Sequence, residues 1–173
     1  MSTWMVVEDE PDIYEVLLAM FAMWSIEGVA FVDGEEATAW IEDVDSGRYR
    51  GELPELALLD IRLPGSIKGY HVAQRLRQSA ILGTIAIVLI TSFKLTSEEY
   101  TEIMAISGAN DLIYKPLPDF DEFKRQLEAV VARQHAAAPQ KVPVPVPTPA
   151  PTPAPAPTPT LPPANPVTQD KKD

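Results

Sequence analysis

Five residues with chemically active side chains lie at the ends of short apolar runs, which are typical of buried strands. They are the acids Glu8, Asp9 and Asp60, the hydroxyl residue Thr91, and Lys115. More than 100 positions separate the first from the last, so only the fold can bring them together. Three carboxylates, a hydroxyl and an ammonium at one place can hold a cation and transfer an anionic group.

Crowded acids repel one another unless they are protonated or bridged by a cation, so this set predicts a divalent metal. Mg²⁺ is the expected cofactor because it accepts one or two carboxylates, keeps several waters and binds phosphoryl oxygens. An aspartate can then attack phosphorus as a nucleophile, since the charge on the transferring group is neutralised. Lys115 is expected to pair with that phosphoryl group, and the Thr91 hydroxyl to hydrogen-bond it.

The surrounding pattern predicts an α/β fold. Short apolar runs alternate five times with amphipathic segments of helix length, which indicates a parallel sheet with helices on both faces. The carboxyl ends of parallel strands share one edge, where ligands bind beside the point at which strand order reverses. The predicted strands are Thr3–Val7, Val29–Val32, Leu56–Leu59, Ile85–Ile90 and Asp111–Tyr114, and the predicted helices are Pro11–Trp24, Gly34–Asp45, Tyr70–Ser79, Ser97–Ser107 and Asp119–Gln134.

Composition changes near residue 136. Of the 18 prolines, 13 lie from Pro139 onward, in Val-Pro, Thr-Pro and Ala-Pro repeats that favour extended polyproline II over helix or sheet. Residues 1–136 are therefore predicted to form one domain, and residues 137–173 a disordered tail rich in Pro, Ala and Thr with no output domain after it. The tail is interpreted as a solvated spacer, with a ligand for a proline-binding groove as the alternative.

Composition also excludes several classes of protein. The chain has no cysteine, which rules out disulfides, thiolate chemistry and Cys-ligated zinc. Its formal charge is −11, and the tail carries three lysines against two aspartates, which leaves −12 on the domain. Such an acidic surface argues against a nucleic-acid partner. No segment has the apolar length of a membrane span or the pattern of a signal peptide, so we expect no membrane insertion and a cytoplasmic location.

The segments around the five residues resemble the receiver domain of bacterial two-component response regulators, over roughly residues 3–134. The order of these segments and their placement at successive strand ends carry the resemblance. It implies a doubly wound sheet in the flavodoxin-like order 2-1-3-4-5, as in single-domain chemotaxis receivers. The matching segments are Val6-Val7-Glu8-Asp9-Glu10-Pro11, Leu58-Leu59-Asp60-Ile61-Arg62-Leu63-Pro64-Gly65, Ile90-Thr91-Ser92, Gly108-Ala109-Asn110-Asp111 and Lys115-Pro116.

The resemblance assigns a role to each site residue. Asp60 is the expected phosphoacceptor, and Thr91 and Lys115 act on the phosphoryl group. The metal is expected on Asp9, Asp60 and the backbone carbonyl of Arg62, together with the acidic-pair member Glu8. This Glu8 stands where the family more often has aspartate, so the longer side chain is expected to reach the metal through water.

The same resemblance implies the partners. A sensor histidine kinase or a histidine phosphotransfer protein is the expected donor, and a downstream protein of unknown identity is the expected target. The domain is not expected to be an enzyme in the ordinary sense, because a receiver catalyses only its own phosphorylation and slow autodephosphorylation. Tyr14, Leu18 and Ala22, on the outer side of the first helix, are interpreted as a docking surface for the kinase.

Three departures from the family pattern concern signalling. Leu112 lies where the family usually has a switch aromatic, although Tyr114 is on the same side of the strand by its period of two. The loop from Pro64 to Lys68 is one residue longer than usual, and the loop after Thr91 is about two residues longer. We therefore expect Thr91 to transmit phosphorylation mainly through its own loop.

These departures leave alternatives open. The first is a binding module or adaptor with the receiver fold that works without phosphorylation. A phosphohydrolase with Asp60 as nucleophile is disfavoured, because its second acid is expected two residues later, where this chain has Arg62. A flavin carrier is disfavoured as well, because residues 8–10 are acidic where a hydroxyl-rich phosphate-binding loop is required.

Overall fold

The computed structural model describes residues 1–137, so the predicted tail lies outside the described residues apart from Ala137, which is helical. Five strands alternate with five helices, in agreement with the sequence pattern. The strands are β1 (Thr3–Val7), β2 (Glu27–Phe31), β3 (Leu56–Asp60), β4 (Ala86–Thr91) and β5 (Asp111–Tyr114), and the helices are α1 (Pro11–Met23), α2 (Gly34–Asp45), α3 (Gly69–Gln78), α4 (Ser97–Ser107) and α5 (Phe120–Ala137).

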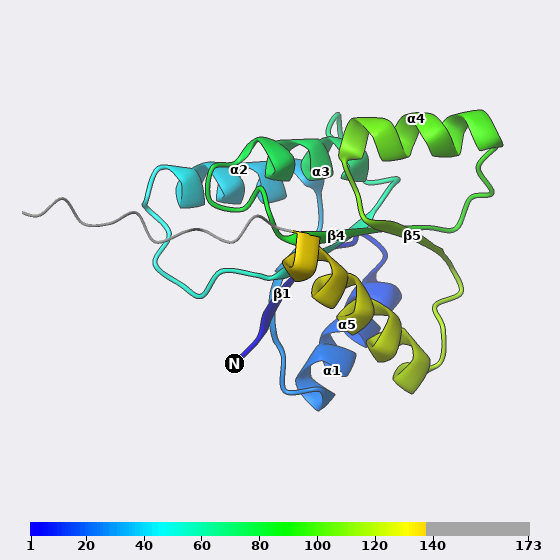
Figure 1. Cartoon of the computed structure of the whole chain (residues 1–173), viewed down its shortest axis with the longest axis horizontal. Helices are drawn as coiled ribbons and strands as arrows, with labels where there is room; N and C mark the ends of the chain where they lie inside the picture. Colours follow the sequence, from blue (N-terminus) through cyan, green and yellow to red (C-terminus); the bar gives the residue numbers. More distant parts are fainter. Residues whose placement is uncertain (138–173) are drawn as a thin grey trace, which may run out of the picture. The chain divides into compact units, whose positions relative to one another are not determined.

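The strands form one parallel sheet in the order β2-β1-β3-β4-β5, which confirms the predicted doubly wound fold. Helices α2, α3 and α4 cover one face, and α1 and α5 cover the other (Figure 1). β2 lies on one side of β1, and the later strands β3, β4 and β5 follow on its other side. The strand order therefore reverses between β1 and β3. The carboxyl ends of β1, β3 and β4 are therefore the place for a ligand.

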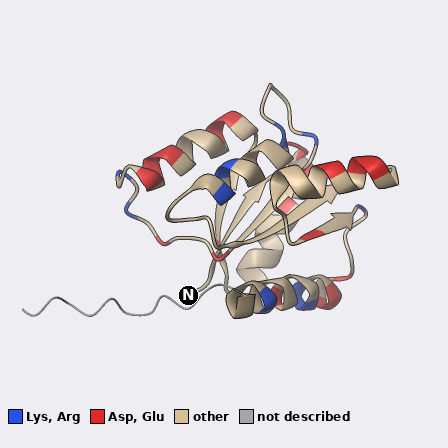
Figure 2. Ribbon diagram, turned by 45° about the horizontal axis from the view of Figure 1, so that its top comes forward, with Lys and Arg blue, Asp and Glu red and all other residues tan. Residues whose placement is uncertain are grey.

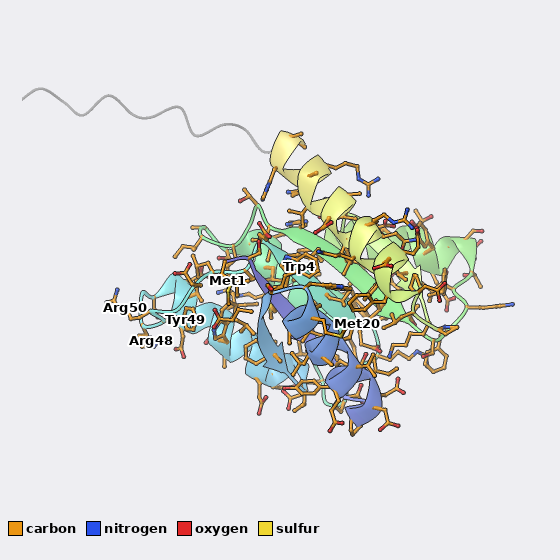
Figure 3. All side chains as sticks on the ribbon, turned by 90° about the horizontal axis from the view of Figure 1, so that it is seen from below. Met1, Trp4, Met20, Arg48, Tyr49 and Arg50 are labelled. Atoms are coloured by element: carbon orange, nitrogen blue, oxygen red, sulfur yellow. The ribbon has the colours of Figure 1, made fainter. Side chains whose placement is uncertain are left out.

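The central strands are buried on both faces, and every residue of β1, β3 and β4 is inaccessible to solvent or nearly so. On the α1 and α5 side, Trp4 packs edge-on against Phe21 at 5.4 Å between ring centroids. Figure 3 looks onto this side and labels Trp4 on β1, between α1 and α5. A rigid sheet of this kind fixes the positions of side chains at its carboxyl edge.

Several boundaries differ from the prediction by one to three residues. β2 begins at Glu27 because the turn after α1 is tight, with Ser25 in the left-handed region at φ 58°. Asp60 and Thr91 are the last residues of their strands instead of the first residues of loops, because the parallel pairing continues to them. α5 continues to Ala137, past the predicted Gln134. Among residues 1–137, no helix combines the length and hydropathy needed to cross a bilayer.

One residue of the predicted docking surface on α1 is less exposed than expected, and the docking role itself stays a prediction. Leu17 and Phe21 are fully buried, as expected for the core face of this helix. Leu18, however, is partly buried and packs against the core beside Gly28 of β2. The edge strand therefore covers more of the helix than the helical period alone indicates.

Candidate phosphorylation site

The predicted site residues meet at the carboxyl edge of the sheet. Glu8 directly follows β1, and its amide donates to the carbonyl of Phe31 in β2 at 3.1 Å. Asp60 ends β3, and Thr91 ends β4. Lys115 follows β5, and its amide donates to the Thr91 carbonyl at 2.8 Å. Backbone pairing thus aligns the strand ends and brings these side chains together at one edge of the sheet.

Lys115 lies at the centre of this group. Its Nζ is 2.6 Å from Asp60 Oδ2, 2.9 Å from Glu8 Oε2 and 2.9 Å from Glu10 Oε1. The Asp60 and Glu8 side chains are buried, whereas that of Glu10 is 56% exposed. Glu10 was not among the predicted site residues, because its position beside the acidic pair does not say where its side chain points. One ammonium therefore holds three carboxylates together.

Glu8, Asp9 and Asp60 form a compact acidic cluster, in which one carboxylate oxygen from each lies within 4.8 Å of the others. Glu8 Oε2 is buried and, within residues 1–137, has no hydrogen bond of good geometry beyond its charge contact with Lys115. Asp9 is exposed and gives the cluster a side open to solvent. An all-oxygen donor set with one side open to solvent fits Mg²⁺ with several waters retained.

Burial and the contact between Glu8 and Lys115 have opposite effects on the pKa values of these two residues. Burial raises the pKa of Glu8, and the neighbouring Asp60 charge raises it further, against the lowering effect of the Lys115 ammonium. Burial by itself lowers the pKa of Lys115, but hydrogen bonds to Asp60, Glu8 and Glu10 outweigh it and raise that pKa above its ordinary value. Lys115 is thus firmly held in its charged form.

Arg62 contacts Asp60 through its backbone. Its amide donates to Asp60 Oδ1 at 2.7 Å, so both oxygens of this carboxylate have fixed partners. Its guanidinium carbon lies 3.5 Å from the ring centroid of Phe93, in the loop after β4. The amide of Phe93 in turn donates to Thr91 Oγ1 at 3.2 Å. The role of the Arg62 carbonyl as a metal ligand stays a prediction.

The longer loop before α3 is held by an unexpected partner. Glu35, in the first turn of α2, accepts hydrogen bonds from the amide of Ser66 at 2.8 Å and from its hydroxyl at 2.9 Å. Gly69 begins α3 directly against Asp60, where any Cβ would clash with the Asp60 carbonyl oxygen. The loop is therefore held toward α2, and the end of β3 at Asp60 packs directly against the start of α3.

Comparison with known proteins decides the family. The family model described as "Response regulator receiver domain" matches residues 4–128. The chain belongs to the receiver domain family. This receiver domain is 30% identical over 135 residues to the transcriptional regulatory protein AruR of Pseudomonas aeruginosa, which covers 78% of the chain and 51% of the relative. The chain thus spans about half the length of this curated relative.

Two solved structures are also similar to the receiver domain. One is the receiver domain of a sensor histidine kinase from Pseudomonas aeruginosa, with a magnesium ion coordinated in its active site cleft. It is 25% identical, with a TM-score of 0.61 over 76% of this chain and 98% of that chain. The other is a CheY-like receiver domain protein from Methanospirillum hungatei. It is 18% identical, with a TM-score of 0.65 over 80% of this chain and 99% of that chain, and supports the fold alone.

The receiver domain has no aromatic at position 112. Leu112 is partly buried and packs against the core on the α2–α4 side. Tyr114 is paired in register with Thr91 but is 44% exposed. Leu112 therefore has no polar ring tip to present to solvent.

Proposed function

We propose that Asp60 accepts a phosphoryl group in a Mg²⁺-dependent reaction and that the phosphorylated domain signals by contacting another protein. The observation that carries this proposal is the contact of 2.6 Å between Lys115 Nζ and Asp60 Oδ2 beside the acidic cluster. A buried carboxylate with its own fixed ammonium, next to two further acids, combines a nucleophile with charges for a phosphoryl group. An aspartate whose only role was to form a solvent-exposed turn would need none of these partners.

In the proposed reaction, one Asp60 carboxylate oxygen forms a bond to phosphorus. The bond from phosphorus to the donor breaks, and its electron pair leaves with the donor atom, which is an imidazole nitrogen for phosphohistidine or a carboxylate oxygen for acetyl phosphate. Glu8, Asp9 and Asp60 are the residues that would hold Mg²⁺, with the Arg62 carbonyl as the proposed further ligand. When bound, the ion neutralises phosphoryl charge.

Lys115 and Thr91 have distinct proposed roles. The ammonium of Lys115 leaves part of its carboxylate contacts and binds a phosphoryl oxygen, because the new group adds negative charge beside it. The Thr91 hydroxyl donates its proton in a hydrogen bond to another phosphoryl oxygen, since within residues 1–137 it is found only as an acceptor. Hydrolysis of the acyl phosphate returns inorganic phosphate and the Asp60 carboxylate.

The proposed donor is a sensor histidine kinase or a histidine phosphotransfer protein, as for other receiver domains. The phosphoryl group of either donor comes ultimately from ATP, so the proposed location is the cytoplasm. Figure 2 shows several acidic residues along the ribbons of α2 and α4. We therefore expect the partners of this domain to be proteins and not nucleic acid.

One observation favours a second candidate function, a receiver-fold binding module that works without phosphorylation. Position 112 holds leucine, where the family usually has the aromatic residue that responds to phosphorylation. Incubation with acetyl phosphate, with and without Mg²⁺, followed by intact-mass measurement separates the two. One added phosphoryl group in the wild type, and none in Asp60→Asn, supports the proposal. Asp111→Asn is the matched control, because Asp111 lies at the opposite end of the sheet. A wild type that never gains mass favours the binding module.

A further inference from the structure

The stack of Arg62 on Phe93 joins the two loops that flank Asp60. The guanidinium carbon lies 3.5 Å from the ring centroid, at the distance of a close cation–π contact. Arg62 belongs to the loop after β3, and Phe93 to the loop after β4. Phe93 is 45% exposed, so burial in the core does not hold its ring. We call this pair the clasp.

Each half of the clasp is bonded to a residue that phosphorylation would affect. On one side, the Arg62 amide donates to Asp60 Oδ1 at 2.7 Å. On the other side, the Phe93 amide donates to Thr91 Oγ1 at 3.2 Å. The clasp therefore connects Asp60, the proposed phosphoacceptor, with Thr91, whose hydroxyl is expected to move toward the phosphoryl group.

A phosphoryl group on Asp60 would disturb both halves. The new oxygen–phosphorus bond takes negative charge away from the carboxylate whose Oδ1 accepts from the Arg62 amide, so this hydrogen bond weakens or shifts. A hydroxyl can accept one hydrogen bond while it donates another, so Thr91 can keep the Phe93 amide as it turns toward the phosphoryl group. The Phe93 backbone then moves with Thr91, and its ring moves relative to the guanidinium.

We infer that Arg62 and Phe93 are positioning residues that carry the phosphorylation signal from Thr91 to the start of α4, in place of the aromatic missing at position 112. This inference rests on the proposed function. The half-exposed ring of Phe93 is free to change its surroundings, whereas Leu112 is packed against the core. The predicted extension of this loop by about two residues would provide the length for such a movement.

The clasp also borders a surface that a partner can sense. Arg62 lines a cleft of about 350 Å³ between α3 and α4, together with Tyr70, Leu95 and Ile103. Leu95 lies in the same loop as Phe93, directly before the cap residue Thr96 of α4. Release of Arg62 from Phe93 would change the shape and charge of this cleft, which makes a local movement visible on the outer surface.

The test is an NMR measurement on the full chain, with beryllofluoride and Mg²⁺ as the phosphoryl mimic. In the resting wild type, the ring current of Phe93 should shift the Arg62 Hδ and Nε–H signals upfield, and the mimic should remove most of this shift. In Phe93→Leu, which keeps apolar bulk, the upfield shift should be absent from the start. Its amide response at residues 96–99 should fall to about half or less. The conservative variant Phe93→Tyr should restore both signals.

The outcomes separate this inference from the proposed function. Mass spectrometry after acetyl phosphate treatment should show normal phosphoryl uptake at Asp60 in all three proteins. If phosphoryl uptake is normal but the Arg62 chemical shifts do not change when the mimic is added, the inference about the clasp is overturned and the proposed function is not. A full amide response at residues 96–99 in Phe93→Leu has the same consequence. An absence of uptake in the wild type overturns the proposed function and the inference built on it.

Discussion

The Lys115 ammonium nitrogen lies 2.6 Å from Asp60 Oδ2, although 55 positions separate the two residues in sequence. Both side chains are only 6% exposed. The same ammonium contacts the carboxylate of Glu8, which is fully buried. Before any phosphoryl group arrives, this contact stabilises charges that would otherwise repel one another, so the resting site depends on Lys115.

Removal of that cation should therefore destabilise the fold. We expect Lys115→Ala to lower the free energy of unfolding by about 3–5 kcal/mol, because two buried carboxylates lose their compensating charge. Urea unfolding in the absence of divalent ions measures this. The control is Arg48→Ala, which breaks an exposed pair with Asp43 and should cost less than about 1 kcal/mol. Equal losses in the two variants would contradict a buried charge centre.

Mg²⁺ should stabilise the domain through the acidic cluster. At an ion concentration about 100 times its dissociation constant, the wild type should gain about 2.7 kcal/mol in unfolding free energy. Asp9→Asn should gain only a small part of this at the same concentration, because one charged ligand is lost. Asp12→Asn, an acid in the first turn of α1, is the control and should respond as the wild type does. Thermal unfolding across a Mg²⁺ series tests this, and an unchanged gain in Asp9→Asn would remove Asp9 from the site.

Acidification should release the loop before α3. Hydrogen bonds from the Ser66 amide, and then from its hydroxyl, hold the pKa of Glu35 below its ordinary value of 4.5. The stabilising contribution of an acid whose pKa is lowered by folding is present above the unfolded pKa and lost as pH falls through the folded pKa. The Ser66 amide signal should accordingly titrate with a midpoint below 4.5.

A variant checks the same contact at neutral pH. Glu35→Gln should speed hydrogen exchange at the Ser66 and Ile67 amides, because both donate to Glu35 Oε1. Glu36→Gln, the next residue on α2, should leave that exchange unchanged, since Glu36 does not bond this loop among the described contacts. A midpoint at or above 4.5, or equal exchange in both variants, would argue against the anchor.

The response to phosphorylation should be centred on the loop after β4. With beryllofluoride and Mg²⁺, the largest amide shifts are expected at Asp60 and residues 91–100, with small ones at Leu112 and Tyr114. Tyr114→Ala should leave this pattern in place. If Tyr114 instead shows the dominant change and Tyr114→Ala abolishes the response at residues 91–100, the aromatic switch lies on β5 after all.

The parallel sheet and the grouping of Glu8, Asp9, Asp60, Thr91 and Lys115 could be predicted from sequence. Each of these residues ends or directly follows a short apolar run that forms a strand. Because the carboxyl ends of parallel strands lie at one edge of the sheet, residues at these positions must lie close together. Residues at the ends of buried strands are well specified by this rule.

Contacts made by loops and exposed side chains could not be predicted. Glu10 reaches Lys115, and Glu35 holds the loop at Ser66, through rotamers that no period encodes. The Arg62–Phe93 stack joins two loops of irregular length, so their relative position depends on the finished fold. Leu18 was misplaced because helical period describes one helix, whereas the edge strand β2 decides what covers its flank.

The most direct test of the central claim is to locate the phosphoryl group. After treatment with acetyl phosphate and Mg²⁺, borohydride reduction converts a phosphorylated aspartate to homoserine, which tandem mass spectrometry assigns to a single position. The account predicts homoserine at position 60 in the wild type, dependent on Mg²⁺, and at no position in Asp60→Asn. Homoserine at Asp9 or Asp111, or no conversion while the fold is intact, would contradict Asp60 as the phosphoacceptor.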